Sequence, residues 1–408
     1  MTSVDTKGAG GALIALEERF AARNYSPLPI VLTRGEGCFV WDVEGRRYLD
    51  GLSSYAALNQ GHRHPRIVAA LVEQAQRLTL TSRAFHNDRM GPFLERLCAV
   101  TGFPRALPMN TGAEAVETAV KAMRRWGHER KGVPEGEGEI VVAAGNFHGR
   151  TLLAVSLSTD PASYRGYGPY VPGIVKVPFG DADALAEVLG PHTVGVLLEP
   201  IQGEAGVIVP PPDYLPRVRA LCAERRVALC LDEVQTGFGR TGRMFAWQHW
   251  GARPDLVCVG KALSGGVYPV SAVCGEPDIL DVFTPGTHGS TYGGNPLAAA
   301  VGSAALQVTV EERLPDRAAA LGAVAIPRLS QALAGAPAVK EVRGRGLMIA
   351  VQFQAAVAQR VAGTLAREAA VLCKDTHGHT VRFMPPLVTP EDVLMDAVER
   401  MVPILARG

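Results

Sequence analysis

The sequence alternates short apolar runs rich in β-branched residues with longer segments of helical periodicity, and this alternation constrains the fold most. The apolar runs that we interpret as strands cover residues 139–145, 151–158, 194–200, 227–233, 256–260 and 270–275. Strands that are separated by helices usually form a parallel sheet with helices on both faces. The pattern therefore predicts an α/β fold with a mostly parallel sheet flanked by helices.

The composition and pattern of the sequence change near residue 300, where Ala/Leu-rich helical patterns with a few short strands begin. We expect a large ligand-binding domain over residues 51–300 and a smaller α+β domain over residues 301–408. The N-terminal segment, residues 1–50, is expected to pack with the small domain. A chain of 408 residues is long enough for two such units.

Charge and cysteine content narrow the class of partner. The chain has 41 basic and 40 acidic residues, a net charge of +1 and no long run of one sign, which argues against nucleic acid or an anionic membrane as the partner. Its seven cysteines include no CxxC pair, so neither a disulfide framework nor a zinc site is indicated. The apolar patch at residues 10–20 is too short for a secretory core or a membrane span. We expect a cytoplasmic protein that binds small molecules and no metal.

Polar side chains follow four of the predicted strands. In parallel sheets, ligands bind beyond the carboxyl ends of the strands. Any one of these residues alone reads most simply as a solvated strand end, but together they form a constellation. They are Asn146, Phe147 and His148 after the first run, Glu199, the pair Asp232 and Glu233, and Lys261.

Lys261 ends a fully apolar run and is the residue with the clearest chemical meaning. Desolvation disfavours its ammonium form, and a neutral lysine is a nucleophile toward carbonyls. If that carbonyl is the aldehyde of pyridoxal phosphate, the site also needs a carboxylate for the ring nitrogen, donors for the phosphate and a flat group against the ring. Asp232, at the end of the preceding strand, is the candidate carboxylate.

Two segments of small and hydroxyl-bearing residues are candidates for phosphate binding. The stretch MNTGAEAVETAVKAMRRWG, from Met109, places small residues ahead of a helical pattern that carries Glu117 and Lys121 four residues apart. Free backbone N–H groups at a helix start bind phosphate well. The stretch HGSTYGGNP supplies Ser290 and Thr291. The first segment could equally be a capped helix, and the second a plain loop.

Five motifs together resemble the class III aminotransferases, which are pyridoxal-phosphate enzymes of fold type I. The motifs are LDEVQTGFGRTG, GKALSGGVYPVSAV, MNTGAEAVETA, EPIQGEAGV and HGSTYGGNP, and the likeness extends from NYSPLPIVLTRGEG to RFMPPLV. It covers nearly the whole chain. The resemblance implies the fold type I architecture and pyridoxal 5'-phosphate as the cofactor.

The resemblance also implies roles for individual residues around the cofactor ring. Lys261 would be the Schiff-base lysine and Asp232 the partner of the pyridinium nitrogen. Gln235 would hydrogen-bond the ring 3-oxygen, and Phe147 would stack on the ring.

A further set of residues would hold the cofactor phosphate. By the same resemblance, Gly112 and Ala113 at the helix start would bind it, with Ser290 and Thr291 as hydroxyl donors. Thr291 would come from a neighbouring subunit, so the family implies a homodimer or a higher homo-oligomer.

Within the family, the residues resemble the branch that acts on ornithine. The stretches NYSPLP and LSSYAALNQGH place Tyr25 and Tyr55 as substrate-facing tyrosines, and NFHGRT supplies Arg150 to clamp a carboxylate. Glu204 and Arg382 complete the substrate set. The resemblance implies transfer of the δ-amino group of L-ornithine to 2-oxoglutarate, giving glutamate 5-semialdehyde, which cyclises, and L-glutamate.

Several histidines are not assigned a function by the sequence. His148 stands where animal members of the ornithine branch have tryptophan, and histidine there is common elsewhere in the family. The pairs GHRHP, with His62 and His64, and THGHT, with His377 and His379, read as loop structure rather than as metal sites.

Other functions remain as alternatives. Within the family they are acetylornithine, 4-aminobutyrate or lysine aminotransferase, or an aminomutase, and Tyr55 speaks against the first two because those relatives have an aliphatic residue there. A nicotinamide-dependent dehydrogenase would share the alternating pattern, but it needs a GxGxxG turn after the first strand, which the sequence lacks. A non-catalytic regulator that binds pyridoxal phosphate would need a DNA-binding module, for which no length is left.

Overall fold

The structure is a computed structural model, and it describes residues 9–408. Its central element is a seven-stranded sheet with the order β4-β10-β9-β8-β7-β5-β6. The strands β5 to β9 run parallel to one another, and β10 is antiparallel to both β9 and β4. Their bounds are β4 Arg105–Met109, β5 Glu139–Ala143, β6 Ile174–Val177, β7 Thr193–Leu198, β8 Ala228–Asp232, β9 Leu256–Val259 and β10 Ser271–Gly275. The predicted mostly parallel sheet is confirmed.

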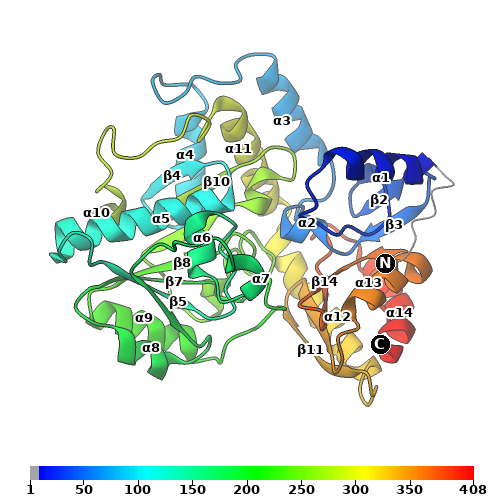
Figure 1. The fold of residues 1–408 in the computed structure, drawn as a ribbon. Coiled ribbons are helices and arrows are strands. Elements are labelled where there is room, and N and C mark those ends of the chain that lie inside the picture. The colour runs from blue at the N-terminus through cyan, green and yellow to red at the C-terminus, as the bar shows by residue number, and fades with distance from the viewer. Residues whose placement is uncertain (1–8) are drawn as a thin grey trace.

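Helices cover both faces of this sheet (Figure 1). Successive residues of β5 point to opposite faces, so Ile140 packs with α5 while Val141 packs with α8 and α9. Both are fully buried, which explains why the strands read as continuous apolar runs. The helices of this region are α2 Ser53–Ala56, α3 Pro65–Ala75, α4 Met90–Thr101, α5 Gly112–Trp126, α6 Leu152–Leu157, α7 Pro161–Tyr164, α8 Ala182–Val188, α9 Tyr214–Glu224, α10 Pro277–Leu280 and α11 Pro296–Glu311.

One predicted strand is wrong. Residues 151–158 form the short helix α6, which Thr151 caps by accepting the N–H of Ala154 at 3.2 Å. A short apolar run does not distinguish a strand from a buried helix, and here the capping threonine favours the helix. Conversely, the structure adds β4 and β6, which are short and carry prolines or a lysine among their apolar residues.

Two four-stranded sheets lie beside the large one, with orders β1-β2-β3-β13 and β11-β12-β15-β14. Their strands are β1 Leu32–Glu36, β2 Phe39–Asp42, β3 Arg47–Asp50, β11 Val339–Arg345, β12 Met348–Phe353, β13 Val371–Leu372, β14 Lys374–Thr376 and β15 Thr380–Phe383. The helices are α1 Ala9–Phe20, α12 Leu314–Ala332, α13 Ala358–Thr364 and α14 Glu391–Arg407. Short 3-10 or π turns, Gly127–Lys131, Ala246–His249, Lys261–Ser264 and Leu365–Ala369, complete the chain.

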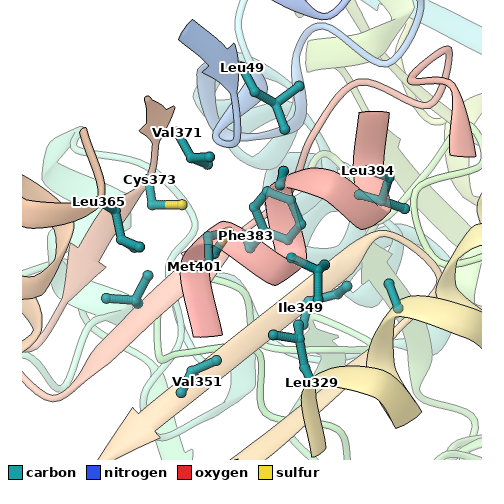
Figure 2. Close-up of a cluster of buried hydrophobic side chains, with 14 of the residues drawn as sticks. Leu49, Leu329, Ile349, Val351, Leu365, Val371, Cys373, Phe383, Leu394 and Met401 are labelled. Carbon is teal, nitrogen blue, oxygen red and sulfur yellow. The ribbon is translucent and has the colours of Figure 1, made fainter. Parts of the chain in front are cut away.

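The N-terminal and C-terminal segments share one core. β3 pairs in parallel with β13, and Leu49 of β3 lies among apolar side chains of the C-terminal region such as Val371, Phe383 and Met401 (Figure 2). Helix α11 runs across residue 300 and packs on α3 and α4. We propose that the boundary between the two units falls at Arg313, which joins α11 to α12 with a φ of 51°.

The buried Arg240 ties the loop after β8 to the C-terminal unit. It is fully buried, and its guanidinium donates to the carbonyls of Leu347 at 3.0 Å and Pro385 at 2.6 Å, and to Asn59 Oδ1 at 2.5 Å. Removing the donor leaves three buried acceptors unsatisfied. We therefore expect Arg240→Met to lower the free energy of unfolding by about 3 kcal/mol.

Urea denaturation followed by circular dichroism measures this effect. Arg217→Met is the matched control, because Arg217 pairs with Asp183 on the surface and should leave the midpoint unchanged. An unchanged midpoint for Arg240→Met would show that the network does not hold the units together.

Candidate active site

A cavity of about 190 Å³ lies at the carboxyl ends of the strands of the large sheet. The end of β8 and the segments after β5, β7 and β9 reach it, because parallel strands present the same ends at one edge. Seven residues assigned to the site from the sequence line this cavity: Gly112, Ala113, Phe147, Glu204, Asp232, Gln235 and Lys261. Stretches far apart in the chain are thus brought to one place.

Lys261 begins a 3-10 turn directly after β9, and its backbone has a φ of 43°. A left-handed conformation in a residue other than glycine costs about 1–3 kcal/mol. Burial lowers the pKa of Lys261 below its usual value, although the carboxylates of Glu204 and Asp232 act in the opposite direction. The site therefore favours the neutral, nucleophilic amine more than water does.

Asp232 is held by two contacts at the end of β8. Its Oδ2 lies 2.8 Å from Nδ1 of His148, and its Oδ1 accepts the N–H of Val234 at 3.0 Å. Burial opposes the charged form of His148, but the hydrogen bond and charge of Asp232 outweigh it and raise the histidine's pKa. His148, which the sequence analysis placed among the strand-end residues without assigning it a role, thus supports the carboxylate of the site.

Glu199 is a second residue that the sequence singled out as a strand end but did not assign to the site. It lines the cavity, and its carboxylate accepts the N–H of Phe147 at 3.0 Å and of Gly203 at 3.3 Å. Burial raises the pKa of Glu199 to about 7. Its position at the end of a buried strand was the available signal. Glu233, by contrast, points away and holds the turn at residues 246–249 through the N–H groups of Ala246 and Trp247.

The start of α5 forms one wall of the cavity. Thr111 caps the helix, since its Oγ1 accepts the N–H of Glu114 at 3.2 Å while the Glu114 carboxylate accepts the N–H of Thr111 at 2.7 Å. Gly112 and Ala113, the first two helical residues, line the cavity. The predicted helix start is confirmed, and the first-turn N–H groups of a helix have no intrahelical acceptor, so those of Gly112 and Ala113 are available to a ligand.

A second cavity of about 310 Å³ adjoins the first, because Phe147 and Glu204 line both. Arg150 lies in this second cavity. Glu204 is held by the buried Arg382, whose Nη1 donates to its Oε1 at 2.6 Å, and by Gln235 Nε2 at 3.1 Å. Burial by itself would raise the pKa of Glu204, but Arg382 outweighs it and the net shift is downward.

Five predicted residues lie outside the lining of both cavities, and Arg382 is the one among them that contacts a lining residue, Glu204, through an ion pair. Tyr55 is close by, with its ring 5.3 Å from the Arg382 guanidinium carbon. Tyr25 is 83% exposed, and Thr291 is exposed as well. Ser290 holds its own loop, accepting from Asn110 Nδ2 at 3.1 Å and the N–H of Gly293 at 3.0 Å. The roles of these residues remain predictions.

The first histidine pair, His62 and His64, contacts carboxylates that are distant in sequence. His62 Nε2 lies 2.8 Å from Asp50 Oδ2, and His64 Nε2 lies 2.9 Å from Glu312 Oε1. Among residues 9–408, His, Cys, Asp and Glu side chains form no group of three or more that could hold a metal ion. Within the same residues, no helix has the length and apolar character needed to cross a membrane.

Comparison with known proteins identifies the family. Residues 20–405 match the family described as Aminotransferase class-III. The chain is a class III aminotransferase. It is 54% identical over 395 residues to an ornithine aminotransferase of Bordetella pertussis, covering 96% of this chain and 95% of that protein.

Solved structures of class III aminotransferases agree with this fold. The ornithine aminotransferase of Toxoplasma gondii superimposes with a TM-score of 0.96 at 44% identity, covering 98% of this chain and 95% of that one. An acetylornithine aminotransferase from Elizabethkingia anophelis gives a TM-score of 0.88, also at 44% identity, covering 97% and 98%. The predicted fold type I architecture is confirmed.

Class III aminotransferases use pyridoxal phosphate, and the first cavity fits it. Two lining residues have buried polar atoms with no partner within residues 9–408, namely Nε2 of His148 and Oε1 of Gln235. The cavity also combines a buried lysine, a carboxylate, an aromatic ring and a helix start, which matches the parts of the cofactor. A Cβ atom at Gly203 would lie 1.6 Å from Gln235 Oε1, so glycine is required there to keep this side chain in place.

Proposed function

We propose that this class III aminotransferase transfers the δ-amino group of L-ornithine to 2-oxoglutarate, giving glutamate 5-semialdehyde, which cyclises, and L-glutamate. The observation that carries this proposal is the pair of adjoining cavities, with Lys261 in one and Arg150 in the other. A donor whose reacting amine and carboxylate are at opposite ends of a short chain suits such a site. The curated relatives named ornithine aminotransferase support it further.

The residues of the first cavity have distinct proposed roles. Pyridoxal phosphate, when bound, supplies a ring that delocalises the electron pair left on the substrate carbon. Lys261 Nζ would hold the cofactor and would move the proton of the donor carbon. Asp232 would keep the ring nitrogen protonated, and Gln235 would hydrogen-bond the ring 3-oxygen. Gly112 and Ala113 would bind the phosphate through their N–H groups.

Ornithine and glutamate pose opposite problems to one site. Ornithine must present its δ-amine, with its α-carboxylate on Arg150, whereas glutamate must present its α-amine and needs a cation near the cofactor. We propose that Arg382 is this cation. It is masked by Glu204 while ornithine reacts, and its Nε has no partner within residues 9–408. A permanent structural ion pair is the alternative.

The ion pair gives a specific prediction for Glu204→Ala. Without the carboxylate, Arg382 is unmasked, so the half-reaction with glutamate is kept or accelerated while ornithine can bind in the reversed direction. We expect δ-selectivity to fall by about ten- to a hundredfold, the size of a partly buried ion-pair effect. Single-turnover spectra with each amino acid, and the ratio of ornithine products, measure it.

The matched control is Glu341→Ala, which removes the ion pair between Glu341 and Arg343. Neither of these residues lines a cavity of the site. This variant should leave both half-reactions unchanged. If Glu204→Ala slows both half-reactions equally and ornithine still yields only the δ-semialdehyde, the masking role is wrong.

A panel of amino donors tests the proposed function directly. Purified holoenzyme is assayed with ornithine, N-acetylornithine, lysine and 4-aminobutyrate, each with 2-oxoglutarate. We expect ornithine to have the highest kcat/KM. A higher value for N-acetylornithine would assign the chain to the activity of its Elizabethkingia anophelis neighbour instead.

Assembly and location are part of the same proposal. We infer a homodimer, because Thr291 is exposed on its own subunit and lines neither cavity, as expected if it completes the site of a second copy. Light scattering of the purified protein tests this. We place the enzyme in the reducing cytoplasm, which the seven free cysteines support.

A further inference from the structure

The second cavity contains a carboxylate to which the proposed reaction assigns no role. Its charged or titratable lining residues are Arg150, Asp160, Glu204 and His377. Asp160 and Ser163 come from the start of α7, and His377 comes from the turn after β14 on the C-terminal unit, so the lining residues place the cavity where the two units meet. The elements α7 and β14 are labelled in Figure 1.

Asp160, Ser163 and Arg150 form a hydrogen-bonded chain. Arg150 Nη1 donates to Ser163 Oγ at 2.9 Å, and Ser163 Oγ donates to Asp160 Oδ2 at 2.8 Å. Ser163 is only 6% exposed, so its hydroxyl is fixed between the two charged groups. The chain aligns a cation and an anion along one wall of the cavity.

Arg150 and Asp160 both line the cavity, and both keep hydrogen-bonding capacity that no other side chain of residues 9–408 uses. Arg150 has five N–H donors and uses one of them on Ser163, which leaves a fork for a carboxylate. Asp160 accepts only the N–H of Ala162 and the hydroxyl of Ser163, and no Lys, Arg or His nitrogen of residues 9–408 forms a salt bridge with it. The other carboxylate, Glu204, is already paired with Arg382.

We propose that Asp160 determines specificity for the free α-ammonium group of the amino donor. This inference rests on the proposed function, in which the α-carboxylate of ornithine lies on Arg150. The α-ammonium group is attached to the same carbon as that carboxylate, so the donor presents a cation and an anion side by side. The wall formed by Arg150 and Asp160 is complementary to this pair of charges. Ser163 is a positioning residue that fixes the spacing of the two.

Two donors that differ only in the α-ammonium group isolate this role. Ornithine and 5-aminopentanoate have the same carbon chain, the same δ-amine and the same carboxylate, and only ornithine has the α-amino group. The quantity to measure is the ratio of kcat/KM for ornithine to that for 5-aminopentanoate. This ratio is insensitive to general damage to the cofactor site, because such damage lowers kcat/KM for both donors by the same factor. Both donors react at the equivalent carbon, the one that bears the δ-amine.

Asp160→Asn is the diagnostic variant. Asparagine caps a helix as well as aspartate does, so α7 should keep its N-terminus. We expect the ratio to fall by about ten- to a hundredfold, the range of a hydrogen bond to a charged group, with kcat/KM for 5-aminopentanoate almost unchanged. The matched control is Asp181→Asn, since Asp181 caps α8 in the same way and lines neither cavity. This control should leave the ratio unchanged.

Ser163→Ala separates positioning of Arg150 from recognition by Asp160. We expect it to raise KM for both donors by a similar factor, because each has a carboxylate, while kcat changes little. Ser163→Thr, which keeps the hydroxyl, should restore KM.

An unchanged donor ratio in Asp160→Asn, with an active wild-type enzyme, would overturn the inference. Equal losses for both donors in that variant would also overturn it, because they would make Asp160 a structural residue only. A wild-type enzyme that does not use ornithine would instead refute the proposed function, and this result is visible before any variant is made.

Discussion

Replacing Lys261 by alanine is expected to lower turnover by about 10⁴-fold or more while pyridoxal phosphate still binds noncovalently. The proposal assigns two tasks to this amine, since it anchors the cofactor and moves the proton of the donor carbon. Alanine removes both but leaves the remaining lining residues of the cavity in place. Steady-state assays, together with the absorbance of the cofactor after gel filtration, measure the two effects separately.

Lys340→Ala serves as the control for Lys261→Ala, because Lys340 is an exposed lysine on β11. Its activity should equal that of the wild type. Activity near wild type in Lys261→Ala would end the assignment of this residue, and loss of all cofactor binding would show that the other lining residues do not hold the cofactor.

Asp232→Asn is expected to fold and to bind cofactor but to lose about three orders of magnitude in rate, about 4 kcal/mol of transition-state stabilisation. Asparagine has nearly the same shape as aspartate but no negative charge, so the proton on the ring nitrogen loses its partner. The amide can still accept the N–H of Val234, as Asp232 Oδ1 does at 3.0 Å. Single-turnover rates with ornithine measure the loss.

Asp255→Asn is the matched control for Asp232→Asn. Asp255 binds Arg219 at 2.8 Å and the N–H of Leu229, and it lies outside both cavities. It should affect stability without affecting the chemical step. A loss of less than tenfold in Asp232→Asn would mean that another residue holds the ring proton.

The large sheet could be predicted because strands that are buried on both faces appear in the sequence as continuous apolar runs. Five of the six predicted strands are confirmed as β5, β7, β8, β9 and β10. The strand predicted for residues 151–158 was wrong because a short run of apolar residues fits a buried helix equally well. β4 and β6 were missed because their pattern is interrupted by Pro108 and Lys176.

The residues of the first cavity were identifiable because each follows a strand or begins a helix. Their roles came from the motifs of the family, which span nearly the whole chain. Local sequence could not show that Glu199 would join the cavity while Glu233 would turn away, since both follow buried strands. Likewise, local sequence could not show that His62 and His64 would contact Asp50 and Glu312, which are distant in the chain.

The sequence by itself determined five strands of the large sheet and the helix start at Gly112, because these depend on periodicity and on neighbours along the chain. The motifs shared with the family implied the set of chemical groups around Lys261. Only the tertiary structure decided which distant groups meet. It placed His148 against Asp232, Arg382 against Glu204, and Asp160 in line with Arg150. It also fixed the left-handed backbone at Lys261. Such pairings and strained turns depend on burial and on packing between units, and neither has a signature in local sequence.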